Sequence, residues 1–314
     1  MLTKTDCNMS KIKEYIRLIK KSIVNSAYQE DFFLNKVGFV CKRQYLEDCA
    51  LNSSKMGVVQ MDNKEHIIVS LTTYGKRIFS VYRTIESIFQ QSYKVSKVVL
   101  YLSDEEFKDE ELPLLLQNQK ERGLEIRYVK DIRAYTKLIP ALRDFPDSTI
   151  ITVDDDYMYP VDAIEKLVLA HRLHKNAVCC HASRAILMDS SNNLMPYSSF
   201  RQIFPKTYET NISYMAEGFG MVLYPPKCMY SDVTNEEIFM KLSPLADDLW
   251  YKCMQLIVGT PVVQLPRTKA WFNEMYSDES VQDIALANQN VNENKNDPQL
   301  KAIFDYYNLY SKLI

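Results

Sequence analysis

Short runs of β-branched and other apolar residues alternate with helical segments through the first half of the chain. The runs cover 66–71 (HIIVSL), 97–102 (KVVLYL), 124–129 (LEIRYV) and 149–153 (TIITV). Segments with helical periodicity cover 78–90, 135–142 and 162–174. Runs this short and apolar are typical of buried parallel strands, and their alternation with helices builds βαβ units. The sequence therefore predicts an α/β fold, with an open, mostly parallel sheet and helices on both faces.

The second half of the chain is less regular. It predicts a long loop over 190–215, a strand over 219–224, a helix over 247–257 closed by Gly259, a strand over 261–265 and a final helix over 299–313. We expect three parts: a helical N-terminal extension over 1–64, an α/β domain over 65–275, and a C-terminal polar loop and helix over 276–314.

The N-terminal extension begins with a basic amphipathic pattern. Apolar residues recur at helical spacing over 10–28, and lysine and arginine fall largely on the other side. Such a helix can lie on an anionic membrane surface, or it can pack on its own domain and leave its basic face in water. The sequence leaves both interpretations open.

Charge, hydropathy and cysteine spacing exclude several classes of protein. The formal charge of −2, from 38 basic and 40 acidic residues, excludes the basic surface of a general nucleic-acid-binding protein. Every uncharged apolar stretch is shorter than the roughly 18 residues of a membrane span. The seven cysteines form no Cys-x-x-Cys spacing, and Lys4, Asp6 and Lys11 interrupt any secretory signal at the start. We therefore expect a protein of the reducing cytoplasm.

Glycine is scarce in this chain. Seven residues in 314 are about 2%, against a usual ~7%. No Gly-x-x-x-x-Gly-Lys-Ser/Thr motif occurs, and the one Gly-x-Gly, Gly218-Phe219-Gly220, lacks the third glycine of a dinucleotide fingerprint. A cradle of backbone N–H groups around a phosphate is therefore not expected. A phosphorylated ligand would be neutralised by a metal or by side chains, for which Lys76 and Arg77 are candidates unless they are ordinary solvated charges.

Three consecutive carboxylates, Asp154, Asp155 and Asp156, follow the predicted strand over 149–153. Repulsion and desolvation both oppose this arrangement, and a divalent cation relieves them. Mg²⁺ or Mn²⁺ commonly takes one or two carboxylates and completes its shell with water and substrate phosphates. The alternative is a structural role, because acids stabilise the start of a helix such as the one that Pro160 opens.

From His66 to Leu265 the chain resembles the family 2 glycosyltransferases with the GT-A fold, which use nucleotide sugars. The resemblance rests on three motifs in order along the chain: HIIVSLTTYGKR, IITVDDDYMYP and PLADDLW. It implies a GT-A domain over 65–275, a nucleoside diphosphate sugar as donor and a divalent metal as cofactor. It also implies a role in bacterial surface polysaccharide assembly.

The resemblance assigns nucleoside contacts to the ends of the first two strands. Thr72, Thr73 and Tyr74 stand where the family has a Pro-Thr-Tyr-Asn-like turn, although Thr72 replaces the proline and Gly75 the asparagine. Asp104 matches the acid that hydrogen-bonds the base, although the family's Asp-Gly-Ser run is absent here. The other interpretation of Asp104 is a surface carboxylate that caps a turn.

The same resemblance makes the aspartate triplet the family's Asp-x-Asp motif. Asp154 corresponds to the carboxylate that faces the ribose and sugar, and Asp156 to the metal ligand, with Asp154 as a second ligand. Asp155 is a further donor contact, because three aspartates in a row leave the register open. Lys137 falls where related enzymes present a side chain to the donor, and a cation there would meet the diphosphate charge.

A second acidic pair, Asp247-Asp248, begins the predicted helix over 247–257. For transfer with inversion, a carboxylate takes the proton of the acceptor hydroxyl while its oxygen attacks the anomeric carbon. The family places this base in an acidic pair, and matching its second member makes Asp248 the catalytic base, with Asp247 as the alternative. Both acids can instead be structural, favoured by the helix dipole.

Together these features predict an inverting, metal-assisted glycosyltransferase with Mn²⁺ or Mg²⁺ as cofactor and a UDP-sugar as donor. The acceptor would be a hydroxyl of a glycan or lipid-linked glycan, and the N-terminal helix would dock the enzyme at the inner membrane surface. Two alternatives stay open: a sugar-1-phosphate nucleotidylyltransferase, and a carbohydrate-binding protein that kept the fold without catalysis.

Overall fold

The computed structural model describes residues 33–59, 66–266, 275–277 and 295–313. Residues 33–52 are helical, which confirms a helical N-terminal part. Packing divides the chain after Tyr45, and the residues from Leu46 onward belong to one compact unit. The predicted amphipathic helix over 10–28 lies outside the described residues.

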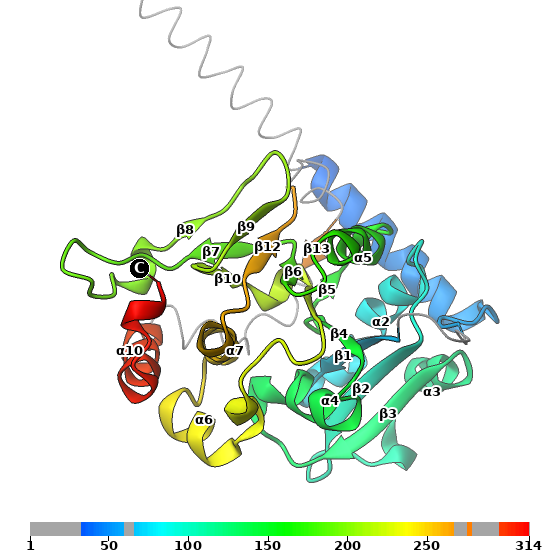
Figure 1. The fold of residues 1–314 in the computed structure, drawn as a ribbon. Helices are drawn as coiled ribbons and strands as arrows, with labels where there is room; N and C mark the ends of the chain where they lie inside the picture. Colours follow the sequence, from blue (N-terminus) through cyan, green and yellow to red (C-terminus); the bar gives the residue numbers. More distant parts are fainter. Residues whose placement is uncertain (1–32, 60–65, 267–274, 278–294, 314) are drawn as a thin grey trace, which may run out of the picture. The chain divides into compact units, whose positions relative to one another are not determined.

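The compact unit is built on a sheet with the strand order β3-β2-β1-β4-β11-β6-β12-β9 (Figure 1). Its strands are β1 (Ile67–Thr72), β2 (Lys97–Ser103), β3 (Leu124–Val129), β4 (Thr149–Thr152), β6 (Val178–Cys180), β9 (Glu209–Asn211), β11 (Val222–Tyr224) and β12 (Val262–Gln264). β1 pairs in parallel with β2 and β4, β2 with β3, and β6 with β12. β11 runs antiparallel to β4 and β6, and β9 runs antiparallel to β12. The predicted open, mostly parallel sheet is confirmed.

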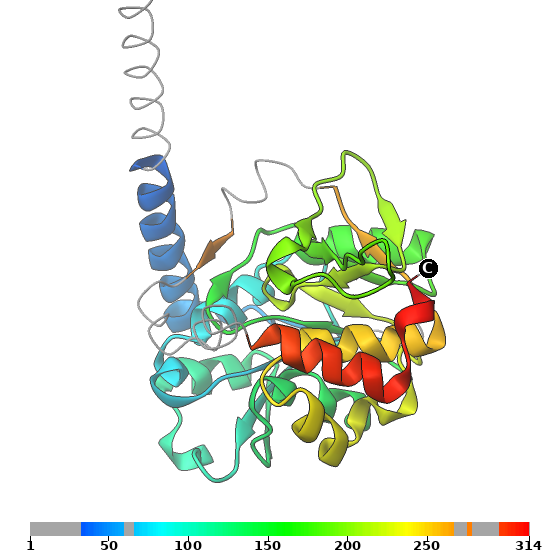
Figure 2. The same ribbon diagram turned by 90° about the vertical axis from the view of Figure 1, so that its left-hand side faces the viewer.

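Helices cover both faces of this sheet because strand side chains alternate between the faces. Ile67, Val69 and Leu71 of β1 pack in one apolar core, whereas Ile68 packs in the other. The first core contains residues of α2 (Tyr82–Phe89), α3 (Leu114–Glu121) and α5 (Ala163–Leu173). The second contains residues of α4 (Ile139–Asp144), α6 (Glu236–Leu242), α7 (Asp247–Val258) and α10 (Asn296–Tyr307). Figure 2 shows α10, in red, lying beside α7.

Short 3₁₀ helices complete the connections. They are η1 (Gly75–Phe79), η2 (Asp109–Glu111), η3 (Arg133–Lys137), η4 (Tyr197–Ser199), η5 (Gly218–Gly220), η6 (Ser231–Thr234) and η8 (Tyr310–Lys312). The predicted helix over 135–142 is therefore divided into η3 and α4. The α-helix begins only where Pro140 supplies a helical φ in its first turn.

The prediction of a long loop over 190–215 is wrong. This segment contributes β8 (Arg201–Gln202), β9 and β10 (Tyr214–Ala216), and a small sheet forms with the order β10-β7-β8, where β7 is Ser183–Ala185. Another small sheet pairs β5 (Tyr157–Met158) with β13 (Tyr276–Ser277). β8 and β9 are short and exposed, so they lack the apolar alternation that marks a strand in a sequence. The predicted strand over 219–224 is half right, because 218–220 form η5.

The strands β1 and β4 lie side by side and end at the same edge of the sheet. The chain leaves β1 toward β2 on one side and later returns to β4 on the other, so the strand order reverses between them. In open α/β sheets, ligands bind in the crevice beyond the carboxyl ends of the strands at such a switch point. Thr72 at the end of β1, Thr73 directly after it, and the aspartates that follow β4 all lie at this edge.

One lysine is buried in α7 without a compensating partner. Lys252 is 1% exposed, and its Nζ has no hydrogen-bond partner among the described residues. An ammonium loses its hydration on burial, and this lowers the pKa of Lys252 to about 7. The folded chain therefore binds fewer protons than the unfolded chain between about pH 7 and the ordinary lysine pKa of 10.5.

We predict that Lys252→Met stabilises the protein most at low pH. In the wild type, the contribution of Lys252 to the free energy of unfolding rises with pH between about pH 7 and 10.5, and the penalty of the buried lysine is complete below that window. The penalty is on the order of a few kcal/mol. Urea unfolding at about pH 6.5 and about pH 9.5 measures it, and the variant should gain more at the lower pH. An equal gain at both pH values would show that burial does not shift the titration of Lys252.

Candidate active site

A cavity of about 530 Å³ lies at the carboxyl edge of β1 and β4, a volume typical of small-ligand sites. Its walls come from the ends of these two strands, from η1 and η3, from residues 215–219 and from the start of α7. It therefore joins segments that are far apart in the sequence, at the place where the topology predicts a ligand.

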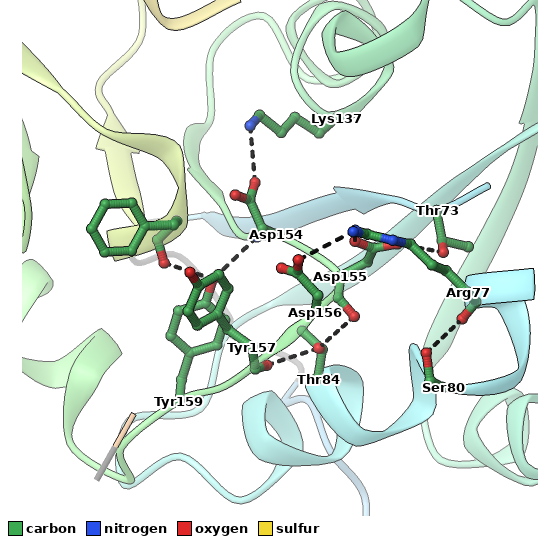
Figure 3. A network of polar contacts seen from close by, with 11 residues as sticks. Thr73, Arg77, Ser80, Thr84, Lys137, Asp154, Asp155, Asp156, Tyr157 and Tyr159 are labelled. Carbon is green, nitrogen blue, oxygen red and sulfur yellow. Dashed lines mark hydrogen bonds and ion pairs between the residues drawn. The ribbon is translucent and has the colours of Figure 1, made fainter. Parts of the chain in front are cut away.

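The middle aspartate of the triplet is held by an arginine and a threonine. Arg77 donates from a guanidinium nitrogen to Asp155 Oδ1 over 2.6 Å, and the Thr73 hydroxyl donates to Asp155 Oδ2 over 2.6 Å (Figure 3). The same nitrogen of Arg77 lies 3.3 Å from Asp156 Oδ2. Thr84 donates to the main-chain carbonyl of Asp155. Arg77 is buried, so its interpretation as an ordinary solvated charge is wrong.

A buried lysine bridges the triplet and the second acidic pair. Lys137 Nζ lies 2.9 Å from Asp154 Oδ1 and 3.1 Å from Asp247 Oδ2. Burial lowers the pKa of Lys137, but Asp154, Asp247 and Asp248 more than offset this and hold it well above its usual range. Lys137 is therefore a fixed cation at neutral pH. Ser70 of β1 donates to its main-chain carbonyl over 2.6 Å, which ties this cation to the sheet.

Asp248 has one occupied and one open carboxylate oxygen. Oδ2 accepts the main-chain N–H of Gly218 over 3.0 Å, whereas Oδ1 is buried and has no hydrogen-bond partner in the described part of the chain. Burial, and next the charge of Asp247, raise the pKa of Asp248 to about 8. A carboxylate with an open oxygen and a pKa near neutrality is suited to proton transfer.

The structure brings most of the predicted site residues together. Nine of them line the cavity: Thr72, Thr73, Tyr74, Lys137, Asp154, Asp155, Asp156, Asp247 and Asp248. Asp104 does not line it and is exposed, while Ser103 and Glu106 on either side of it do line the cavity. The main-chain N–H of Asp104 donates to the carbonyl of Val129, which extends the β2–β3 pairing past the cavity edge.

Sequence reasoning missed several charged or aromatic residues of the cavity, among them Arg184 and Tyr197, and it did not predict a role for the side chain of Glu217. Arg184 and Tyr197 belong to a region without hydropathy periodicity, so no pattern marks them. Glu217 directly precedes Gly218-Phe219-Gly220. Two glycines so close together allow the backbone to approach a ligand closely, and this feature of the sequence pointed to the segment.

The cavity is acidic overall. Eight of its lining side chains are carboxylates, against four cationic side chains, Arg77, Arg133, Lys137 and Arg184. A ligand that carries a diphosphate would be repelled by this surplus unless a cation entered with it. The residues fit such a cation, since Asp154 and Asp156 both line the cavity and Mg²⁺ or Mn²⁺ commonly needs only one or two carboxylates. No three His, Cys, Asp or Glu side chains of the described residues group as an all-protein metal site.

No family model matches this chain, and no curated protein matches it. Solved structures with some likeness include a mannosyltransferase, PcManGT from Pyrobaculum calidifontis with GDP-Man and Mn²⁺, at 13% identity and a TM-score of 0.40, over 75% of this chain and 65% of that one. Another is TarS 1–349 of S. aureus with UDP, at 13% identity and a TM-score of 0.43, over 64% of this chain and 58% of that one.

A third is a CMP:2-keto-3-deoxy-manno-octonic acid synthetase with CTP, at 13% identity and a TM-score of 0.38, over 65% of this chain and 90% of that one. The chain spans less than two thirds of the length of the mannosyltransferase and of TarS. The three structures are complexes with a nucleotide or a nucleotide sugar.

We predict that Gly218→Ala disrupts the bridge made by Lys137. A Cβ at this position would lie 2.7 Å from Lys137 Nζ and 3.2 Å from Asp248 Oδ1, so the ammonium has to move away from its carboxylates. Overpacking of this kind costs about 1–3 kcal/mol. Urea unfolding measures the loss, and a crystal structure of the variant should show Lys137 displaced. The matched control is Gly259→Ala, where the left-handed backbone costs stability while the cavity is untouched; an unmoved Lys137 in Gly218→Ala would contradict the prediction.

Proposed function

We propose that this protein is an inverting, metal-assisted glycosyltransferase of the GT-A type, with a nucleoside diphosphate sugar as donor and a glycan hydroxyl as acceptor. The observation that carries the proposal is the convergence of Asp154, Lys137 and Asp247-Asp248 in one cavity at the switch point of the sheet. The sequence resemblance to family 2 glycosyltransferases supports the same activity, with a UDP-sugar as the donor.

The donor would lie over the carboxyl ends of β1 and β4. Thr72, Thr73 and Tyr74 would contact the nucleoside, in line with the resemblance. Asp154 and Asp156 would hold a divalent cation, Mn²⁺ or Mg²⁺, both of which prefer oxygen ligands; when bound, it would neutralise charge on the leaving diphosphate. Asp155 would support this arrangement indirectly, because its carboxylate is engaged by Arg77 and Thr73.

Asp248 is the better candidate for the base, because Asp247 is engaged by Lys137. The acceptor hydroxyl would donate its proton to the open Oδ1 of Asp248 as the hydroxyl oxygen forms a bond to the anomeric carbon. The bond from that carbon to the diphosphate oxygen breaks on the opposite face, which gives inversion. Lys137 would stabilise the departing negative charge from the same side as Asp154.

The acceptor and the location belong to the same proposal. We propose a glycan or lipid-linked glycan acceptor and a cytoplasmic enzyme with peripheral contact at the inner membrane surface. Both rest on the resemblance to enzymes of surface polysaccharide assembly and on the basic pattern over 10–28. In the described ranges, no helix combines the length and apolarity needed to cross a bilayer.

We predict that Asp156→Ala and Asp248→Asn fail at different steps. Asp156→Ala should weaken Mn²⁺-dependent UDP binding at least about tenfold, because a ligand of the cation is lost. Asp248→Asn should lower kcat by about 10²–10⁴-fold and leave UDP binding unchanged, because only the base is lost. Calorimetry with UDP and Mn²⁺, and transfer or hydrolysis assays with a panel of UDP-, GDP- and CMP-sugars, measure these effects.

The exposed Asp104 provides a matched control, because Asp104→Ala removes a carboxylate outside the cavity and should change neither quantity. A catalytically inactive carbohydrate-binding protein would show no turnover with any donor. A sugar-1-phosphate nucleotidylyltransferase would form nucleotide sugar from a nucleoside triphosphate. Either result would overturn the proposed activity.

The pH dependence of turnover tests the base separately. Because Asp248 must be ionised to accept a proton and its pKa is raised to about 8, the rate should fall as the pH drops below that value and level off above it. The measurement is kcat/KM for the active donor across about pH 6 to 9. A flat profile over this range would argue against Asp248 as the base.

A further inference from the structure

A second polar cluster lines the same cavity and has no part in the function proposed above. It consists of Arg184 in β7, Tyr197 at the start of η4, and Glu217, which directly precedes η5. The three residues come from the small sheet and its connections, whereas the proposed donor residues follow β1 and β4. The cluster thus adds a separate wall to the cavity.

Glu217 has an unused hydrogen-bond acceptor in a buried position. Its side chain is 9% exposed, and Oε1 accepts the Nε–H of Arg184 over 2.6 Å. Oε2 is buried and has no hydrogen-bond partner among the described residues. A buried acceptor without a partner costs about 1–3 kcal/mol, so a donor group of a ligand bound here would recover that energy.

Arg184 supplies the complementary donors. A guanidinium carries five N–H groups, and the bond to Glu217 uses the one on Nε. The other groups face no acceptor within hydrogen-bond distance in the described part of the chain. The guanidinium carbon lies 5.6 Å from the ring centroid of Tyr197, so the aromatic ring forms the adjoining apolar surface.

We propose that this cluster binds the acceptor as a neutral sugar with two adjacent hydroxyls. One hydroxyl donates to Glu217 Oε2, its neighbour accepts from the Arg184 guanidinium, and the C–H face of the sugar packs against Tyr197. This inference rests on the proposed function, which provides the donor and the base.

Charge and position both favour this ligand class. The Arg184–Glu217 pair has no net charge, and the cavity as a whole has twice as many carboxylates as cations, so an anionic acceptor would be disfavoured. Glu217 is followed by Gly218, whose N–H is bound by Asp248. A sugar hydroxyl held at Glu217 would therefore lie beside the residue whose N–H contacts the proposed base.

The experiment is binding of methyl glycosides to the full chain, measured by saturation-transfer NMR with and without UDP and Mn²⁺. The probes are methyl glucoside, galactoside and mannoside in both anomeric forms, their monodeoxy analogues, and the anionic methyl glucuronide. We expect the wild type to bind at least one neutral glycoside at millimolar concentration, and to lose binding when either of two adjacent hydroxyls is removed.

The informative variant is Glu217→Gln, which keeps the shape and replaces the open acceptor with a donor. It should weaken glycoside binding at least about tenfold and leave the affinity for UDP with Mn²⁺ within about twofold. Tyr197→Ala should also weaken it, through loss of the packing surface. Glu125→Gln is the matched control, because Glu125 pairs with Arg127 outside the cavity and its amide should change neither affinity.

The outcomes separate this inference from the proposed function. If the wild-type protein does not bind UDP, the proposed function is overturned. Glycoside binding that depends on Glu217 would still support an acceptor site at the cluster. Wild-type glycoside affinity in Glu217→Gln, preference for methyl glucuronide, or no binding of any neutral glycoside would each overturn the inference.

Discussion

The site depends on one buried ammonium group. Lys137 lies between Asp154, which follows β4, and Asp247, which begins α7. Two carboxylates brought this close would repel each other by several kcal/mol at the dielectric of a protein interior, about 4 kcal/mol for charges 4 Å apart at an effective dielectric of 20. The ammonium of Lys137 offsets this repulsion, because it forms an ion pair with each carboxylate. Because Ser70 of β1 holds the main chain of Lys137, the position of the second acidic pair relative to the triplet is fixed by the sheet.

The three aspartates of the triplet have different surroundings. Asp155 is engaged by Arg77 and Thr73, so its charge is compensated inside the protein and it anchors the turn after β4. Asp154 and Asp156 remain at the cavity and belong to its surplus of negative charge. Arg77 lies 3.3 Å from Asp156, so the guanidinium also limits the repulsion within the triplet before any ligand enters. The turn is thus stabilised within the protein, while the cavity keeps its surplus of carboxylates.

Much of the fold and part of the site were predictable from the sequence, for identifiable physical reasons. The runs over 66–71, 97–102 and 149–153 form strands that are buried on both faces, and such strands are continuously apolar, so their positions agree with β1, β2 and β4. The run over 124–129 forms the partly buried edge strand β3. The triplet was predictable because carboxylates directly after a buried strand need compensation. The pairing of Arg77 with Asp155 was not predictable, because the residues around Arg77 in the sequence do not show that its side chain is buried. Arg184 was missed because a strand of three residues leaves no periodicity, and only tertiary packing brings it to Glu217.

Two of the seven glycines, Gly218 and Gly220, lie in the loop before β11. The scarcity of glycine predicts that no backbone cradle binds a phosphate. In the structure, one backbone N–H at this site, that of Gly218, donates to the carboxylate of Asp248. A Cβ at position 218 would displace the ammonium of Lys137, and a Cβ at position 220 would lie 2.6 Å from that of Ala182. Met221 follows with a positive φ of 58°, a conformation that costs a non-glycine residue on the order of 1 kcal/mol or more. The loop therefore combines tight packing with local strain at Met221, close to the Gly218 N–H that donates to Asp248.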